Sequence, residues 1–174
     1  MSLYEKLSPF HPETNYLNTV IDTPKGSRNK YSYQEKTGLF ELSGVLPAGA
    51  VFPFDFGFIP QTLGGDGDPL DVLVLMDEPA FVGCVVPARL LGVIEANQTE
   101  KGNTVRNDRL IAVAVDSPAH DHLRSLDDLA EQRLHDIEHF FISYNDAKRK
   151  KFEPLGRFGP DRARSLIDKS QRGK

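Results

Sequence analysis

A turn rich in glycine and proline that runs directly into an apolar segment is the strongest constraint on this chain. Residues 66–71 read Asp-Gly-Asp-Pro-Leu-Asp and carry three carboxylates in six positions. The apolar run 72–75 that follows is typical of a buried strand. Three fixed carboxylates repel one another unless a cation compensates them. Because a hard cation such as Mg²⁺ binds oxygen ligands in a strict geometry, the turn predicts a metal site; an acidic surface turn is the alternative.

Three other motif assignments are excluded. An EF-hand loop requires glycine at its sixth position, where this chain has Asp71. A glycine-rich phosphate loop requires a following G-K-[ST] and a helix, and neither follows Gly64-Gly65. The segment His135–His139 matches the H-x-x-E-H zinc pattern, but on a helical wheel both histidines lie opposite the apolar stripe. We therefore expect these histidines to face solvent.

Composition is that of one globular domain spanning residues 1–174. Hydrophobic residues make up 39% of the chain and charged residues 26%. The net charge of −4 argues against a dedicated nucleic-acid binder. Residues 148–174 carry about +7; such a tail can contact nucleic acid or an acidic neighbour, but a solvated helix and terminus is expected. Cys84 is the single cysteine, and its apolar neighbours indicate a buried, inert thiol. The sequence shows no signal-peptide h-region and no membrane-length apolar stretch, so we expect a cytoplasmic protein without a membrane partner.

Short β-rich segments dominate the first hundred or so residues and predict a barrel or sandwich. They lie at 16–21, 29–33, 71–76, 81–86, 90–96 and 109–115. The polar segment 97–108 contains Gly102-Asn103, a candidate hairpin loop. A helix is expected to begin near Ser125, which forms a capping-box pattern with Asp128, and to carry an apolar stripe as far as Tyr144. A second helix is expected to begin at Pro160.

Several segments together resemble the soluble inorganic pyrophosphatases of the Mg²⁺-dependent barrel family (family I). The hexamer at 66–71 is the most specific of them, and the others lie at 20–31, 56–63, 109–113 and 139–141. The match covers roughly residues 16–170. The resemblance implies an α+β, mainly β fold: a five-stranded barrel similar to an OB-fold, with two C-terminal helices packed outside. It also implies a homo-oligomer.

The resemblance implies Mg²⁺-dependent hydrolysis of pyrophosphate, or of a related phosphate compound, with Mn²⁺ as an alternative ion. Paired metal ions can activate a water and neutralise phosphoryl charge. In this mechanism Asp68 is the general base that accepts the proton of the attacking water. The other implied site residues are the metal ligands Asp66 and Asp71, with Asp108 as a further carboxylate, and the phosphate-site residues Asp22, Arg28, Lys30, Arg109 and Tyr144.

The chain departs from the family pattern at several site positions. They are Ser32 for glutamate, Gly44 for arginine, Phe52 and Phe56 for tyrosines, Gln98 and Asn107 for aspartates, and Asn145 for lysine. Losing one charge-stabilising group often costs about 3 kcal/mol, or roughly a hundredfold in rate. Two functions therefore stay open: a pyrophosphatase, with activity reduced, or a degenerate fold that binds a phosphate ligand or a protein with little hydrolysis. An OB-like nucleic-acid binder is less favoured, because no strand interleaves aromatic and basic residues.

Overall fold

The computed structural model describes residues 3–172. The strands in this range are β1 (Leu17–Thr23), β2 (Asn29–Gln34), β3 (Leu39–Val45), β4 (Asp55–Phe58), β5 (Asp71–Leu75), β6 (Val85–Glu100), β7 (Asn103–Arg106), β8 (Arg109–Ala114) and β9 (Lys151–Phe158). The α-helices are α1 (Glu131–Asp146) and α2 (Pro160–Ser170). Short 3₁₀ helices span Tyr4–Lys6, Pro118–His120 and Leu126–Asp128. This mainly β composition with two helices confirms the expected fold class.

Five strands pair in a ring, which produces the strongly curled, OB-like sheet. Their order is β1-β4-β5-β8-β6, and the first residues of β6 pair back with β1. The rest of β6 pairs with β7 and β9, while β2 and β3 form a separate hairpin. The ring is not a regular closed barrel. A bulge between Leu90 and Gly92 bends β6 where it pairs with β8, and a second bulge, between Pro154 and Gly156, lies on β9 where it pairs with β6. An extra residue on one strand of a pair kinks that strand.

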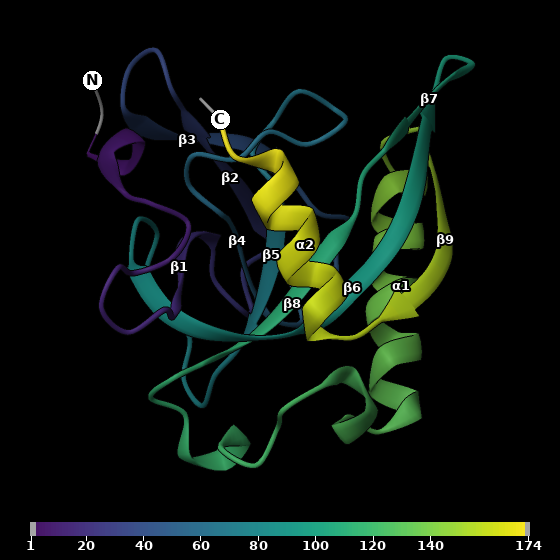
Figure 1. The fold of residues 1–174 in the computed structure, drawn as a ribbon. Coiled ribbons are helices and arrows are strands. Elements are labelled where there is room, and N and C mark those ends of the chain that lie inside the picture. Colours follow the sequence, from purple (N-terminus) through teal and green to yellow (C-terminus); the bar gives the residue numbers. More distant parts are fainter. Residues whose placement is uncertain (1–2, 173–174) are drawn as a thin grey trace.

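The two helices cover opposite faces of this sheet (Figure 1). Strand β5 alternates between them: Leu73 and Leu75 pack in the core that contains α1, whereas Val72 and Val74 pack in the core that contains α2. Strand β8 alternates in the same way. A central strand that is buried on both faces has a continuously apolar sequence, which is why β5 and β8 could be predicted from the sequence. No helix within residues 3–172 has the length and apolar character needed to cross a membrane.

The strand predictions at 16–21, 29–33, 71–76, 90–96 and 109–115 are confirmed, and the prediction at 81–86 is wrong. The segment 81–86 is mostly a turn, and a strand begins only at Val85. Strands β3, β4 and β9 were not predicted, and β9 contains Pro154 and Gly156, which hide its pattern. The hairpin predicted in the polar segment 97–108 is confirmed as β6–β7. Its turn lies at Lys101-Gly102, one residue earlier than the candidate loop Gly102-Asn103, and has positive φ at both residues.

The helix signals were correct in kind. Ser125 and Asp128 form the capping box, but it caps a 3₁₀ turn, and α1 begins only at Glu131. The second helix begins at Pro160 as expected. His135 and His139 are exposed, as the helical wheel predicted.

Strand β4 is held against β1 by a glycine contact that no other residue can replace. A Cβ built on Gly57 would lie 2.1 Å from the Val20 carbonyl oxygen. Gly57 pairs with Ile21 across the two strands, so the contact cannot relax without moving backbone.

We predict that Gly57→Ala destabilises the protein by about 1–3 kcal/mol or more, because overpacking forces backbone shifts. Chemical denaturation monitored by circular dichroism measures the change. Gly102→Ala is a control for loss of a glycine without a clash: its added Cβ meets nothing within 4 Å, although its φ of +78° adds local strain. Equal stability of Gly57→Ala and the unmodified protein would contradict the assigned contact.

Candidate functional site

One cavity collects most of the predicted site residues. Its volume is ≈ 610 Å³. The predicted residues that line it are Asp22, Lys30, Asp66, Asp68, Asp71, Arg109 and Tyr144. They come from the acidic turn, the starts of β5 and β8, the β1 and β2 strands, and the last turns of α1, so the fold rather than the sequence order brings them together.

Strand register places Asp71 against Arg109. Strands β5 and β8 run parallel, and Asp71 is the direct partner of Arg109 at the first position of both. The Arg109 guanidinium donates to the Asp71 carboxylate and to the Asn107 side-chain oxygen. Arg109 also lies over the Phe141 ring, 4.8 Å from its centroid. Arg109, which is only 3% exposed, is therefore held by the Asp71 carboxylate and by the Phe141 ring.

A β-bulge aims Asp22 into the same cavity. Ile21 pairs with Gly57 and Thr23 pairs with Phe56, so Asp22 between them has no partner on β4. Such an extra residue re-aims its side chain. The Asp22 carboxylate accepts a hydrogen bond of 2.7 Å from the Lys30 ammonium, which also donates to the Tyr31 carbonyl oxygen. Burial raises the pKa of Asp22 despite this cation.

Local hydrogen bonds fix the acidic turn. The Asp66 carboxylate accepts from the Asp68 amide at 3.1 Å, and the Gly64 amide donates to the Asp68 carbonyl oxygen at 2.7 Å. A Cβ on Gly65 would lie 2.8 Å from the Arg106 carbonyl oxygen, so glycine lets the turn pack on β7.

The chain end also holds this turn from outside. The Leu63 amide donates to the Ser170 carbonyl oxygen, and the Arg172 amide donates to the Gln61 carbonyl oxygen, each at 2.8 Å. The acidic turn is therefore anchored to the end of α2 as well as to β5.

Burial, together with neighbouring negative charge, raises the pKa of Asp68 and Asp71. Burial raises the pKa of Asp71 to about 6, helped by Asp22 and Asp66 and opposed by Arg109 and Lys30. Burial and the neighbouring Asp66 and Glu35 charges raise the pKa of Asp68. Such mutual repulsion is the electrostatic condition that a bound cation relieves.

A neutral pair occupies one wall of the cavity. The Asn107 amide donates to the Gln98 side-chain oxygen at 2.9 Å, and the Asn107 oxygen accepts from Arg109. Both side chains line the cavity. The pair therefore orients Arg109 on Asp71 without adding a charge.

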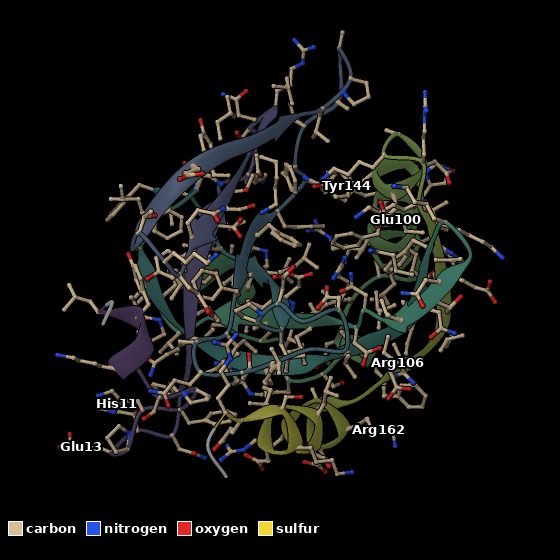
Figure 2. All side chains as sticks on the ribbon, turned by 90° about the horizontal axis from the view of Figure 1, so that it is seen from above. His11, Glu13, Glu100, Arg106, Tyr144 and Arg162 are labelled. Atoms are coloured by element: carbon tan, nitrogen blue, oxygen red, sulfur yellow. The ribbon has the colours of Figure 1, made fainter. Side chains whose placement is uncertain are left out.

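Tyr144 reaches the cavity from α1 on the side of the sheet opposite α2, whereas Arg106 and Arg162 lie beside α2 (Figure 2). Its ring packs on Phe52 and Phe140. Burial raises the pKa of Tyr144 to about 12, so its hydroxyl stays protonated and can donate. Tyr144 therefore packs against the apolar core and also lines the cavity, while its contact with phosphate stays a prediction.

Two predicted residues lie outside the main cavity. Arg28 lines an adjoining cavity of ≈ 340 Å³ beside Gly44, and its Nε donates to the Leu46 carbonyl oxygen at 2.8 Å. Asp108 lines a cavity of ≈ 310 Å³ on the α2 side. Its carboxylate accepts from the Ala96 amide and from the Arg106 guanidinium. Both groups donate to the same oxygen, Oδ1. Asp108 therefore lies apart from Asp66 and Asp71 in the main cavity, and its role as a ligand stays a prediction.

Several residues of the cavity were not predicted from the sequence. They are Glu35, Lys148, Lys150 and Arg172. Lys148 follows Tyr144 by four residues and donates to its hydroxyl, so helical spacing could have revealed it. Glu35 and Arg172 pair at 2.7 Å from distant parts of the chain, and no local pattern joins them.

Comparisons with known proteins agree with this geometry. The model of the inorganic pyrophosphatase family matches residues 19–173. The chain belongs to the inorganic pyrophosphatase family. It is 38% identical over 162 residues to the inorganic pyrophosphatase of Nostoc sp., covering 93% of this chain and 94% of that one. It is 38% identical over 156 residues to that of Geobacillus stearothermophilus, covering 90% and 92%.

Solved structures of the family share the fold. The inorganic pyrophosphatase of Neisseria gonorrhoeae matches with a TM-score of 0.86 at 30% identity, covering 97% of this chain and 96% of that one. That of Thermus thermophilus matches with a TM-score of 0.82 at 33% identity, covering 93% and 92%.

Membership of the inorganic pyrophosphatase family implies a divalent metal cofactor. Asp22, Asp66, Asp68 and Asp71 present oxygen donors to one cavity, which is the donor set that a hard divalent ion requires. In the described conformation no three His, Cys, Asp or Glu side chains of residues 3–172 converge on one point. Lys30 and Arg109 instead pair with Asp22 and Asp71. The donors therefore fit the ion, while two of them are compensated by side-chain cations.

We predict that Asp71→Asn weakens divalent-ion binding at least about tenfold, the equivalent of about 1.4 kcal/mol, because it removes a buried carboxylate from the donor set. Calorimetric titration with Mg²⁺ and with Mn²⁺ measures the affinity. Asp116→Asn, at an exposed residue outside the cavity, is the matched control. Equal affinity in Asp71→Asn and the unmodified protein would show that the ion binds elsewhere.

Proposed function

We propose that this protein hydrolyses inorganic pyrophosphate to two phosphates with Mg²⁺ as its cofactor and Mn²⁺ as an alternative. The observation that carries the proposal is the pairing of opposite charges across one cavity. Carboxylates from the acidic turn and β1 face the cations Lys30, Arg109 and Lys148. A metal–pyrophosphate complex needs both kinds of group, because its metal binds carboxylates and its phosphate oxygens bind cationic donors. Membership of the pyrophosphatase family supports the same reaction.

Asp66 and Asp71 are the residues proposed to hold the metal. The ion supplies charge neutralisation and lowers the pKa of a water, which makes a nucleophile available near neutral pH. Asp68 lies between the two in the turn, and within residues 3–172 its carboxylate accepts no hydrogen bond from a cation. A raised pKa brings a carboxylate closer to neutral pH, where it is a better proton acceptor. We assign the general-base role to Asp68.

The cations of the cavity are proposed to bind the phosphoryl oxygens. Lys30 and Arg109 have carboxylate partners in the described conformation, so substrate binding must exchange those partners for phosphate. Lys148 makes no ion pair with a carboxylate of the described residues, and burial and neighbouring cations lower its pKa. A phosphate beside Lys148 would provide the anionic partner that favours its charged form. Tyr144, with its hydroxyl protonated, is proposed to donate to the same anion.

The neutral and apolar residues at the cavity are expected to limit the rate. Gln98 and Asn107 line it, are neutral and are hydrogen-bonded to each other. Phe56 lines it without a hydroxyl, with its ring 4.6 Å from the Lys30 ammonium, and Phe52 packs against Phe56. Fewer charges mean weaker binding of additional metal ions. The alternative of a degenerate binding module is not favoured. Cytoplasmic location and a homo-oligomeric state stay predictions.

We predict that Asp68→Asn lowers pyrophosphate turnover by at least about a hundredfold while leaving Mg²⁺ affinity nearly unchanged, since general-base catalysis contributes about 10²–10⁴-fold. Phosphate release measures turnover, and calorimetry measures affinity. Asp116→Asn is again the control. Unchanged turnover would assign the base elsewhere, and absence of turnover in the unmodified protein would contradict the proposed function.

A second prediction concerns the neutral pair. The double variant Gln98→Asp with Asn107→Asp should raise turnover and lower the Mg²⁺ concentration needed for half-maximal activity, because it adds two carboxylates to the cavity wall. Phosphate release as a function of Mg²⁺ measures both effects. Asn97→Asp is the matched control, since it adds a charge on the same strand outside the cavity. A fast unmodified enzyme that saturates at low Mg²⁺, with no gain in the double variant, would show that the lost charges are replaced elsewhere.

A further inference from the structure

An aromatic cavity opens directly beside the phosphate cavity. Its volume is ≈ 290 Å³, and it lies between the 3₁₀ turn at the N-terminal end and the acidic turn. Its aromatic walls are Tyr4, Tyr33 and Phe58. Tyr33, Glu35, Phe58, Pro69 and Arg172 line both cavities, so the two adjoin along these residues. A ligand that extends past them would contact both cavities.

The aromatic walls have a fixed geometry. Tyr33 and Phe58 stack with centroids 5.6 Å apart and an angle of 21° between ring planes. Tyr4 stands edge-on to Tyr33 at 5.2 Å and 80°. The Tyr4 hydroxyl donates to the Gly83 carbonyl oxygen at 2.8 Å, which fixes this ring. Rigid aromatic walls of this kind bind flat rings by stacking at low entropic cost.

Polar groups at this cavity have unused capacity. The Tyr33 hydroxyl is buried and has no hydrogen-bond partner among the described residues. A buried hydroxyl without a partner is unfavourable, so a ligand that offers one is favoured there. At the rim, Glu35 and Arg172 form an ion pair of which each side chain is about two-fifths exposed. Such a pair can accept from and donate to the polar edge of a heterocycle.

The rim also lies next to the proposed general base. The charges of Glu35 and Arg172 both act on Asp68, in opposite directions. Pro69, which follows Asp68, lines both cavities. A ring held in the aromatic cavity would thus lie beside Pro69, the residue that follows the proposed general base.

We propose that this aromatic cavity is a ring-binding subsite, and that it takes the base of a nucleoside diphosphate whose phosphates occupy the main cavity. The inference rests on the proposed function of the main cavity. In the reaction, the oxygen of water bonds to the terminal phosphorus and the anhydride P–O bond breaks. The nucleoside monophosphate leaves with the bridging oxygen, and Asp68 accepts the proton of the water. The products are the monophosphate and inorganic phosphate.

The test compares two ligands that differ only in the presence of a nucleoside. Adenosine 5′-diphosphate and methyl diphosphate carry the same anhydride, and calorimetry at constant Mg²⁺ measures their binding. We expect adenosine 5′-diphosphate to bind at least about tenfold more tightly, and its phosphate release to exceed that of methyl diphosphate. Equal affinity for the two ligands overturns the proposal.

Substitutions at Tyr4 test whether the higher affinity for the nucleoside ligand comes from the aromatic cavity. Tyr4 lines only the aromatic cavity, so Tyr4→Ala should lower affinity for adenosine 5′-diphosphate about tenfold, with methyl diphosphate binding and pyrophosphate turnover unchanged. Tyr4→Phe keeps the ring and should retain most of the affinity. A loss of methyl diphosphate binding or of pyrophosphate turnover in Tyr4→Ala would overturn the assignment of Tyr4 to a separate subsite.

Tyr33→Phe tests the hydroxyl if Tyr4→Ala does not fold. Removing an unpaired buried hydroxyl should not lower the melting temperature, yet it should weaken adenosine 5′-diphosphate binding several-fold. Unchanged affinity overturns the assigned hydrogen bond. The two proposals remain separable: pyrophosphate turnover without a preference for the nucleoside ligand contradicts only the subsite, whereas that preference without pyrophosphate turnover contradicts only the proposed function.

Discussion

The parallel pairing of β5 with β8 is the constraint on which the rest of the site depends. It sets Asp71 beside Arg109 at the first position of both strands. Both strands are buried on their two faces by residues that pack toward α1 and α2, so the register cannot shift without exposing a core. The charged pair therefore lies at a fixed point where the apolar layers end. Its position is a consequence of core packing, and its chemistry is a consequence of that position.

Irregularities in the sheet supply the remaining charges. The bulge at Asp22 aims a carboxylate into the cavity. A second bulge, between β2 and β3, lies beside Lys30, the cation that pairs with Asp22. A regular ladder would alternate these side chains between the core and solvent. Because each bulge adds one residue to one strand, a change in loop length elsewhere would not reproduce the arrangement. The catalytic cavity is thus built where the regular sheet is interrupted.

Prediction from the sequence succeeded where a residue pattern is typical of a single kind of local structure. Continuous apolar runs identified β5 and β8, and Pro160 identified the start of α2, while the acidic turn identified the site. Strand β4 was missed because Phe56 and Phe58 flank a glycine whose role is a close backbone approach across strands. The direction of the Asp108 side chain could not be predicted from the sequence either, because the β6–β7 hairpin determines its partners Ala96 and Arg106. Long-range pairs such as Glu35 with Arg172 leave no local periodicity to read.

The anchoring of the acidic turn by the end of α2 has a consequence for local unfolding. The amides of Leu63 and Arg172 are bonded across the junction between the turn and the chain end, and the Thr62 hydroxyl accepts from the Leu70 amide beside them. Segments joined in this way open together as one cooperative unit. Hydrogen exchange at Leu63 and Leu70 would then report the docking of α2, although neither residue belongs to that helix. Fraying of the last turn of α2 would therefore also loosen the acidic turn. The preorganisation of the site thus depends on the C-terminal segment as well as on the sheet.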